Sequence, residues 1–355
     1  MSPLGYNIAN SIEFTVQNNK EIQKVSMTDN TVKVNKVDNN GNLLQGATLQ
    51  VVSAKTKNII DKWVTGQHIF DVTEDILASI KENGSVENMY VDEDDATVLY
   101  KIVSNSNSND YTLMLVKDGE VNYYCIDANG NETSHMVRGL QEGDEYRLVE
   151  LQAPDKYVVA NSIEFATENK DIELSLTDKQ VQISKTDITT GEELEGAKLT
   201  ITDKDGNVVD EWTSTKEPHF ASGLIEGQSY TLTEVSAPYG FTVAESIEFT
   251  VSADKETQKI VMKDDYIYSS VRVVKCDKTT KKAIKSNAFE FSIFADKNCT
   301  KLIATSGANK DDGSALFEKL KYGTYYIKET KAPLGYSLSD QVVEIVINDE
   351  GVFAD

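Results

Sequence analysis

The sequence predicts an all-β protein made of tandem, immunoglobulin-like β-sandwich modules. Three observations support this fold class: strand motifs recur along the chain, apolar and polar residues alternate within them, and turn-forming residues separate them at short intervals. Alternation with a period of two places the apolar side chains on one face of a strand. The segments 203–207 (DKDGN) and 37–42 (VDNNGN) have the composition of hairpin turns, which are typical of β-sandwiches.

The repeated motifs are the strongest signal, because four of them follow one another in a fixed order. They are a [NE]SIEF phrase, a strand ending in Asp, a V-x-[VI]-x-K-x-D strand, and a Y-x-[LI]-x-E strand followed by Ala-Pro. In that order they occur at 10–14, 161–165 and 245–249; 21–29, 171–178 and 257–265; 32–38, 181–187 and 271–277; and 146–154, 230–238 and 325–333. Self-similarity on this scale indicates an array of like modules.

Spacing within the array reveals an insertion. Trp212 precedes Tyr230 by 18 positions, whereas Trp63 precedes Tyr146 by 83 positions. The first full module therefore carries about 65 extra residues, which we place at about 70–135.

The motifs divide the chain into four parts. Residues 1–30 are expected to be the last strands of a truncated upstream module. They are followed by a first module (31–180), a middle module (181–267), and a last module (268–355) that is expected to lack its last strand. Because the chain opens in mid-repeat, we expect it to be a piece of a longer protein.

Composition excludes several classes of function. The 355 residues carry a formal net charge of −23, and a field of this sign repels phosphate backbones, so nucleic acid is not an expected partner. No apolar run approaches the roughly 18 residues of a membrane span. The three cysteines match neither a zinc site nor a disulfide framework, and the three histidines are isolated. We therefore expect no metal, no cofactor and no ordinary enzyme activity.

The insertion is predicted to contain a helix and a hairpin. Residues 71–84 have a helical pattern, with Thr73 as the N-cap and Gly84 at the end. Two strand-like runs flank the turn at 117–120. The acidic segment 91–95 has the composition of a solvated turn rather than of a calcium site.

Two roles remain open for the insertion. Insertions on a stiff scaffold are natural binding sites, so residues 70–135 are a candidate contact for a host extracellular protein or a glycan. The aromatic residues of this segment that could make such a contact are Tyr100, Tyr111, Tyr123 and Tyr124. The alternative is a loop with its own small core and no binding role.

Two histidines, His68 and His219, follow the tryptophan strands at related positions. We expect both to have a packing or turn role.

Three ionisable residues per module continue apolar stripes that point inward. Residues two apart share a strand face, so Lys185 lies on the same face as Val181 and Ile183. The positions of this kind are Lys36, Lys185 and Lys275; Glu150, Glu234 and Glu329; and Asp29, Asp178 and Asp264. Lone charged groups are rarely buried, because their desolvation is costly. The three groups therefore need a joint explanation: a structural ion network, or a covalent bond between the lysine amine and the aspartate carboxyl.

Burial supplies the chemistry for the covalent alternative. An apolar site favours a neutral amine, which is a nucleophile, and neutral carboxylic acids. A protonated glutamate can hydrogen-bond the aspartate carbonyl and transfer protons while the amide forms and water leaves. Neighbouring strands would hold the reacting groups together. Each bond would form once, which is not enzymatic turnover.

Three motifs of the middle module carry a family resemblance. ISKTD (183–187), YTLTEVSAPYGF (230–241) and IVMKD (260–264) resemble the Cna protein B-type, or SpaA-like (prealbumin-like), domains of Gram-positive adhesins and pilins. The resemblance covers nearly the whole chain except the insertion. It implies a prealbumin-like sandwich and an intramolecular isopeptide bond, with Lys185 as amine donor, Glu234 as catalytic acid and Asp264 as acceptor.

The other modules match the same pattern to different extents. The first module matches at all three positions, with Lys36, Glu150 and Asp178. The last module matches at Lys275 and Glu329 only. Asp29 is an acceptor whose lysine is not in this sequence.

The resemblance also implies a place and a role. It predicts the stalk or backbone of an extracellular, cell-wall-anchored surface protein, joined to peptidoglycan through a C-terminal region of the parent protein. The alternative is a ligand-binding adhesin module that uses residues 70–135. A third possibility is an accessory region of a surface hydrolase.

Overall fold

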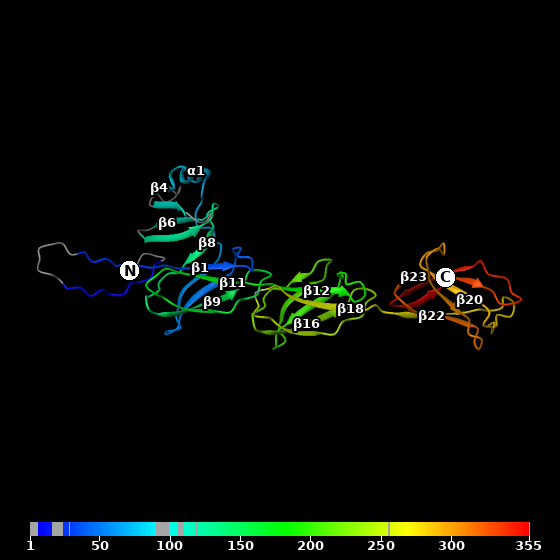
Figure 1. Cartoon of the computed structure of the whole chain (residues 1–355). Coiled ribbons are helices and arrows are strands. Elements are labelled where there is room, and N and C mark those ends of the chain that lie inside the picture. Colours follow the sequence, from blue (N-terminus) through cyan, green and yellow to red (C-terminus); the bar gives the residue numbers. More distant parts are fainter. Residues whose placement is uncertain are drawn as a thin grey trace.

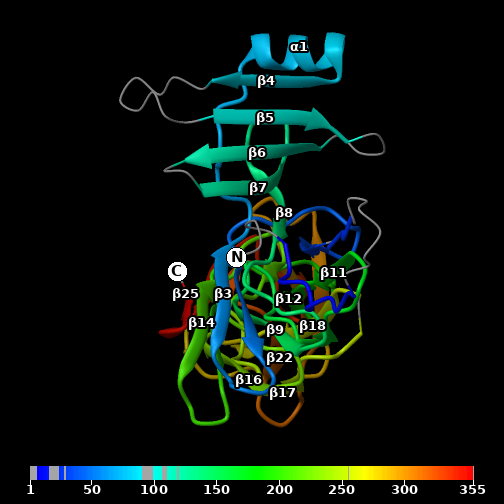
Figure 2. The same ribbon diagram turned by 90° about the vertical axis from the view of Figure 1, so that its left-hand side faces the viewer.

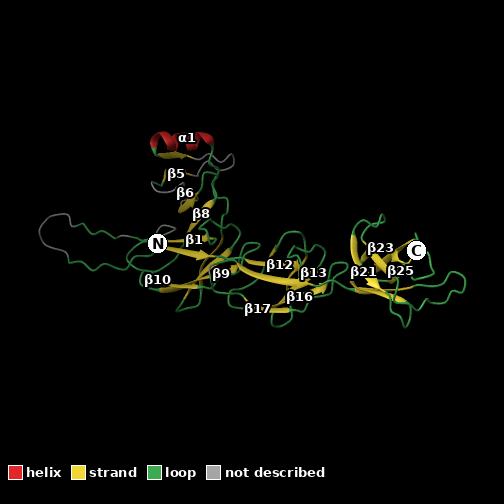
Figure 3. Cartoon of the chain, turned by 45° about the vertical axis from the view of Figure 1, so that its right-hand side comes forward, coloured by secondary structure: helices red, strands yellow, loops and turns green. Residues whose placement is uncertain are grey.

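The computed structural model describes residues 6–15, 24–27, 29–89, 99–105, 110–117, 120–254 and 256–354. Figure 1 shows β modules that follow one another in a row, and Figure 3 shows that strands make up nearly all of the regular structure. Among the described residues, the only helix is α1 (Glu74–Asn83). The predicted all-β fold is confirmed. No helix in the described part of the chain is long and apolar enough to cross a membrane.

The middle module is a sandwich of two sheets. Its strands are β12 (Val181–Asp187), β13 (Lys198–Thr202), β14 (Val208–Thr213), β15 (His219–Phe220), β16 (Ser229–Ser236), β17 (Ile247–Thr250) and β18 (Gln258–Asp264). One sheet has the order β15-β12-β18 and the other β14-β13-β16-β17. Alternate residues of both sheets form the core, including Val181, Leu199 and Leu232, which are fully buried. The first and last strands of the module, β12 and β18, are parallel neighbours.

The first module repeats this plan. Its strands are β1 (Val32–Val37), β2 (Thr48–Ser53), β3 (Ile59–Val64), β9 (Glu145–Gln152), β10 (Ile163–Ala166) and β11 (Ile172–Thr177). The sheet β10-β9-β2-β3 packs against the sheet that contains the parallel pair β1 and β11. The core of this module is separate from that of the middle module.

The insertion extends one of these sheets instead of forming a loop. Its strands are β4 (Ser85–Met89), β5 (Leu99–Ser104), β6 (Tyr111–Lys117), β7 (Glu120–Ile126) and β8 (Glu132–Met136). The extended sheet has the order β11-β1-β8-β7-β6-β5-β4, and Figure 2 shows it projecting from the row with α1 at its far end. The predicted helix and hairpin are confirmed: Thr73 caps α1, Gly84 ends it, and β6 pairs with β7. The acidic segment 91–95 lies outside the described residues.

The last module has the same sheets with one difference. Its strands are β19 (Ser269–Val274), β20 (Glu290–Phe294), β21 (Leu302–Gly307), β22 (Ser314–Leu320), β23 (Gly323–Lys331), β24 (Val342–Asn348) and β25 (Gly351–Ala354). β25 turns back and pairs with β24 in the five-stranded sheet. In the described part of the chain, β19 pairs only with β22 and has no parallel neighbour.

Two expectations about local structure are wrong. Residues 10–14 and the described part of 21–29 form no strands; the N-terminal segment makes only the isolated bridges Tyr6–Thr31 and Ile8–Gln141. A strand needs a ladder partner to satisfy its backbone groups, and no described residues supply one. The turn at 37–42 forms but closes a single bridge, Val37–Leu43, because the strands that flank it belong to different sheets.

Candidate functional site

The lysine and the aspartate of each complete set lie on adjacent parallel strands. In the middle module Lys185 is opposite Met262, so Asp264 is its diagonal neighbour on the same face. In the first module Lys36 is opposite Leu176, which gives Asp178 the same relation. The alternation of side chains along the two strands therefore brings each lysine to its aspartate.

The glutamate approaches from the opposite sheet. Glu234 of β16 pairs with Leu199, next to an irregularity in the ladder, and the same register shift accompanies Glu150 and Glu329. A bulge of this kind re-aims a side chain. Each glutamate is then held by the backbone N–H of the residue ten positions later. The donors are Ala160 N at 2.7 Å, Ala244 N at 2.6 Å and Ser339 N at 3.0 Å.

The two complete sets are closely alike. Lys36 Nζ contacts Asp178 Oδ1 and lies 2.8 Å from Glu150 Oε1. Lys185 Nζ contacts Asp264 Oδ1 and lies 3.0 Å from Glu234 Oε1. The exposed fraction of every one of these six side chains is 2% or less.

In each set two buried carboxyl oxygens have no hydrogen-bond partner. Asp178 Oδ2 and Glu150 Oε1 are buried without a hydrogen bond of good geometry, and so are Asp264 Oδ2 and Glu234 Oε1. A proton shared between the two carboxyl groups would satisfy both oxygens at once. A neutral carboxyl group in each set would supply the missing hydrogen-bond donor.

The electrostatics of the aspartates agree with this conclusion. Burial, with the nearby Glu150 as a further cause, raises the pKa of Asp178 to about 8 although Lys36 acts to lower it. Burial likewise raises the pKa of Asp264 to about 6, against the lowering effect of Lys185. Desolvation penalises the charged form, so the neutral acid persists well above its ordinary pH range.

The incomplete sets are at the two ends of the chain. Lys275 Nζ lies 2.6 Å from Glu329 Oε2, and the side chain of Lys275 is 13% exposed. Glu329 is the only carboxylate within ion-pair distance of Lys275 among the described residues. Asp29 belongs to the N-terminal segment, and that segment lies at the opposite end of the row from the last module (Figure 1).

The prediction for the histidines is wrong in one respect. The partner of His219 in the repeat is His135: His219 pairs with Ile183 and stacks on Trp212, while His135 pairs with Val34 and stacks on Trp63. Both ring-to-ring distances are 4.0 Å. His68 instead precedes the insertion and contacts Asp71.

Two signals in the sequence would have found what the motif search missed. The phrase H-x-x-x-G-L-x-E-G begins at both His135 and His219, which identifies the true pair. The spacing of ten residues from each glutamate to Ala160, Ala244 or Ser339 is also constant. That spacing marks the backbone donors that hold the glutamates.

The tyrosines of the insertion are mostly structural. Tyr100 is buried in the core of the projecting sheet, which contradicts its candidacy as a ligand contact. Tyr111 and Tyr124 pack against the same core, and Tyr123 makes an edge contact with Tyr6 at 5.3 Å. The small core that the alternative interpretation of the insertion predicts is therefore present.

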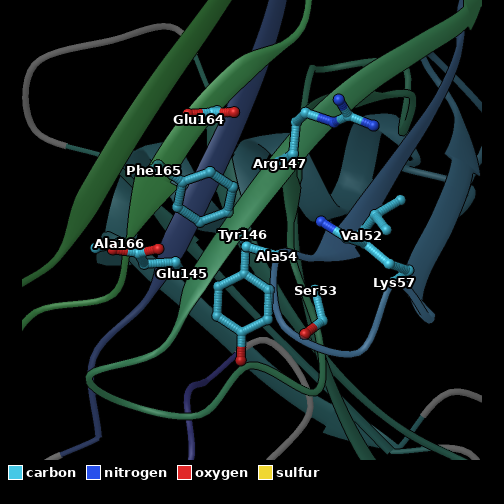
Figure 4. Close-up of a pocket in the computed structure, with 10 residues that line it drawn as sticks. All are labelled: Val52, Ser53, Ala54, Lys57, Glu145, Tyr146, Arg147, Glu164, Phe165 and Ala166. Atoms are coloured by element: carbon cyan, nitrogen blue, oxygen red, sulfur yellow. The ribbon is translucent and has the colours of Figure 1, made fainter.

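A pocket of about 360 Å³ lies on the sheet β10-β9-β2-β3 of the first module. Figure 4 shows the residues that line it. Its aromatic residues, Tyr146 and Phe165, form a ring pair at 5.7 Å that the middle module repeats with Tyr230 and Phe249 at 5.9 Å. An equivalent pair packs in the core of each module, so core packing explains these aromatic residues and they do not indicate a ligand site. The pocket contains none of the Lys–Glu–Asp residues.

Comparison with solved structures gives distant relatives. The Bacillus anthracis TIE protein has 20% identity and a TM-score of 0.39 over 92% of this chain and 51% of that protein, so the chain spans about half its length. The streptococcal ancillary pilin has 16% identity and a TM-score of 0.24, covering 91% and 96% of the two chains. BcpA, the major pilin subunit of Bacillus cereus, has 15% identity and a TM-score of 0.26, covering 90% and 96%.

Comparison of sequences is more direct. No curated protein sequence matches the chain significantly. The family model for the SpaA prealbumin-like fold domain matches three times, at residues 30–180, 179–266 and 269–354. Together these matches take in nearly the whole chain, and they coincide with the three sandwiches of the structure. The chain therefore belongs to the SpaA prealbumin-like domain family, as a tandem of three such domains.

Proposed function

We propose that this chain is a stalk region of a Gram-positive, cell-wall-anchored surface protein, and that intramolecular Lys–Asp isopeptide bonds stabilise its first and middle modules. The observation that carries the proposal is the pair of buried Lys–Glu–Asp sets, Lys36–Glu150–Asp178 and Lys185–Glu234–Asp264, with matching contacts. The family assignment supports the structural role.

The reaction follows from the placement of the three groups. The lysine Nζ attacks the aspartate Cγ, and a C–N bond forms while the bond from Cγ to its hydroxyl oxygen breaks. The neutral glutamate gives its proton to the departing hydroxyl, which leaves as water, and the resulting carboxylate takes a proton from the amine nitrogen. The aspartate must start as the neutral acid, and the raised pKa values of Asp178 and Asp264 favour that state.

The bonds would serve a mechanical role. In the middle module the bond would join β12 to β18, the first and last strands, through which a pulling force enters and leaves. Such a force would be carried by an amide rather than by the hydrogen bonds of the sheet. This arrangement suits an extracellular stalk, where a damaged module is not replaced.

Intact mass tests the proposal. The chain is expected to be lighter than its sequence by two molecules of water, and digestion is expected to release branched peptides that join Lys36 to Asp178 and Lys185 to Asp264. Glu234→Ala should restore one water, whereas Glu248→Ala, on the exposed face of β17, should not. A full, unmodified mass would rule out the bonds, and the Lys–Glu–Asp sets would then be structural ion networks.

Binding of a host protein or a glycan through residues 70–135 is a second candidate function. It is favoured by the projection of the β4–β8 sheet away from the row (Figure 2). A binding screen should compare the chain with a variant in which residues 66–134 are replaced by 215–218, the short link of the middle module. Equal binding by both proteins would exclude a role for the insertion.

A further inference from the structure

One short segment of the first module belongs to a reactive site and to a module junction at the same time. It is the stretch 157–161, which follows the Ala-Pro motif and precedes β10. The backbone N–H of Ala160 holds Glu150 at 2.7 Å, so the segment is part of the Lys–Glu–Asp site of the first module. The neighbours of Ala160 in the segment contact the middle module.

These contacts dock the segment on the middle module. The side chain of Val158 is 1% exposed and belongs to the hydrophobic core of the middle module. Val159 donates its N–H to Leu224 O at 2.8 Å and accepts from Glu226 N at 3.0 Å, which makes a parallel bridge between the modules. Asn161 N donates to Glu226 Oε2 at 3.3 Å. The N–H that holds the glutamate therefore lies between docked residues on both sides.

The middle module also lies close to the aspartate of the same site. A pocket of about 390 Å³ is present where the two modules meet, and Asp178 and Tyr157 of the first module line it. Glu256 and Thr257 of the middle module contribute to its wall. Burial raises the pKa of Asp178 to about 8, against about 6 for Asp264. The larger shift at Asp178 agrees with the additional protein around it.

The junction between the middle and last modules is built differently. Thr242 stands where the first module has Val158, and it is exposed. Val243 stands where the first module has Val159, and it is 57% exposed. Among the described residues, the core of the last module contains no residue of the middle module. The equivalent segment of the middle module is therefore not anchored in its neighbour.

Glu234 is nevertheless held in the same way as Glu150. Its backbone donor, Ala244 N, lies 2.6 Å away. The segment around that donor is tied to the end of its own module, since Thr242 donates its N–H to Asp265 O at 2.9 Å. The middle module therefore positions its glutamate with its own residues, whereas the first module shares this task with its neighbour.

We propose that docking of Val158 on the middle module positions Glu150, so that the Lys36–Asp178 bond forms at its full rate only when this junction is assembled. The inference rests on the isopeptide chemistry proposed above. Val158 is a positioning residue, because it packs in the core of the other module and acts on Glu150 through the backbone of 157–161. The first module would thereby be locked only after its junction with the middle module has formed.

The test compares the rates of the two bonds in the full chain. Peptide mapping at intervals after a pulse of cell-free translation follows the Lys36–Asp178 and Lys185–Asp264 branched peptides in one sample. Val158→Asp should undock the segment, because a carboxylate does not enter an apolar core. It should slow the first bond about tenfold, since misplacing a catalytic group by about 1 Å can cost up to about 100-fold. The second bond should keep its rate.

Three further variants separate positioning from folding. Thr242→Asp places the same charge at the equivalent, exposed position of the middle module and should change neither rate. Val158→Ile keeps an apolar anchor at the junction and should preserve the rate of the first bond. Glu226→Ala removes the acceptor of Asn161 N without altering a core, and it should slow the first bond by a smaller factor.

Three results would overturn the inference while leaving the bonds themselves established. The first is an unchanged rate of the Lys36–Asp178 bond in both Val158→Asp and Glu226→Ala. The second is equal slowing of the two bonds in Val158→Asp, which would mean that this residue acts only through the core of the middle module. The third is slowing of the first bond in Thr242→Asp. Absence of both branched peptides from the unchanged chain would instead remove the isopeptide chemistry, and this inference with it.

Discussion

The middle and last modules begin with the same strand motif but differ in what lies beside it. In the middle module β18 covers the lysine stripe, and the side chain of Lys185 is 2% exposed with two carboxylates in contact. In the last module β19 has one described neighbour, and Lys275 is 13% exposed with one carboxylate. The lysine and the glutamate alone therefore do not make the site.

The difference shows which element the proposed isopeptide chemistry depends on. The parallel strand contributes the aspartate, and it also shields the site from water, a condition that favours the neutral form of that aspartate. The glutamate is already in place without that strand, since Ser339 N holds Glu329 as Ala244 N holds Glu234. The last module thus has the geometry of an unfinished site.

Removing the lysine should destabilise the middle module much more than the last module. Lys185→Ala would lose a bond that closes a loop of 79 residues, for which the chain-entropy model gives roughly 4.5 kcal/mol. The same change at Lys275 removes one hydrogen-bonded ion pair and is expected to cost only about 1–3 kcal/mol. Hydrogen exchange measured separately on β13 and β20 in the full-length chain would give the two free energies of opening. Equal losses in the two modules would contradict the proposed bond.

The pH dependence of the uncrosslinked modules is the next largest effect. In Lys36→Ala and Lys185→Ala no bond can form, so the aspartate stays a free acid. The pKa is about 8 for Asp178 and about 6 for Asp264 in the folded state even with the lysine present, against 3.8 for the unfolded chain. Between those values the folded state binds more protons than the unfolded state, so stability must fall as pH rises from 4. The fall should extend further in the first module.

Tryptophan fluorescence separates the two modules in this experiment. The chain has two tryptophans, Trp63 in the first module and Trp212 in the middle one, so Trp212→Phe and Trp63→Phe backgrounds each report one melting curve. The unmutated chain is the control, because an aspartate in an amide no longer titrates. A melting temperature that rises between pH 4 and pH 8 in the lysine variants would refute the raised pKa values.

Much of this architecture was accessible from sequence because the modules repeat. The alternation along 181–187 places Lys185 on an inward face, and the structure brings it together with Glu234 and Asp264. Repetition was less informative where the first module departs from it. The insertion separates the Trp63 strand from His135, so counting forward from the tryptophan led to His68.

Other features depend on three-dimensional pairing that no local pattern contains. The phrase at 10–14 matches the strand motifs of 161–165 and 245–249, yet it forms no strand because its ladder partners are not among the described residues. The turn at 37–42 has hairpin composition, but the residues after it cross to the opposite sheet. In both places tertiary context overrides local propensity.

The smallest expected effect is a difference in stability between variants of His135 and His219, the two histidines that stack on tryptophans. His135 is buried and bonds to Asp61 at 3.0 Å and Glu132 at 2.9 Å, whereas His219 is 28% exposed and bonds to Asp210 alone. Burial acts to lower the pKa of His135, but its hydrogen bonds to Asp61 and Glu132 outweigh burial and raise that pKa above 6.5. A raised histidine pKa stabilises the folded state fully below the unfolded value and loses that contribution as pH rises through the folded one.

The free energy of unfolding of alanine variants at the two histidines measures this difference. His135→Ala should cost the first module about 1–3 kcal/mol below pH 6, where both of its hydrogen bonds are lost, and the cost should shrink as pH rises. His219→Ala is the matched control, since it removes the same stacking on a tryptophan with only one carboxylate partner, and it should cost the middle module less. Urea unfolding followed by Trp63 or Trp212 fluorescence at several pH values measures both. If the stability lost in His135→Ala instead grew with pH, the folded state would favour the neutral imidazole. Burial would then outweigh the hydrogen bonds to Asp61 and Glu132.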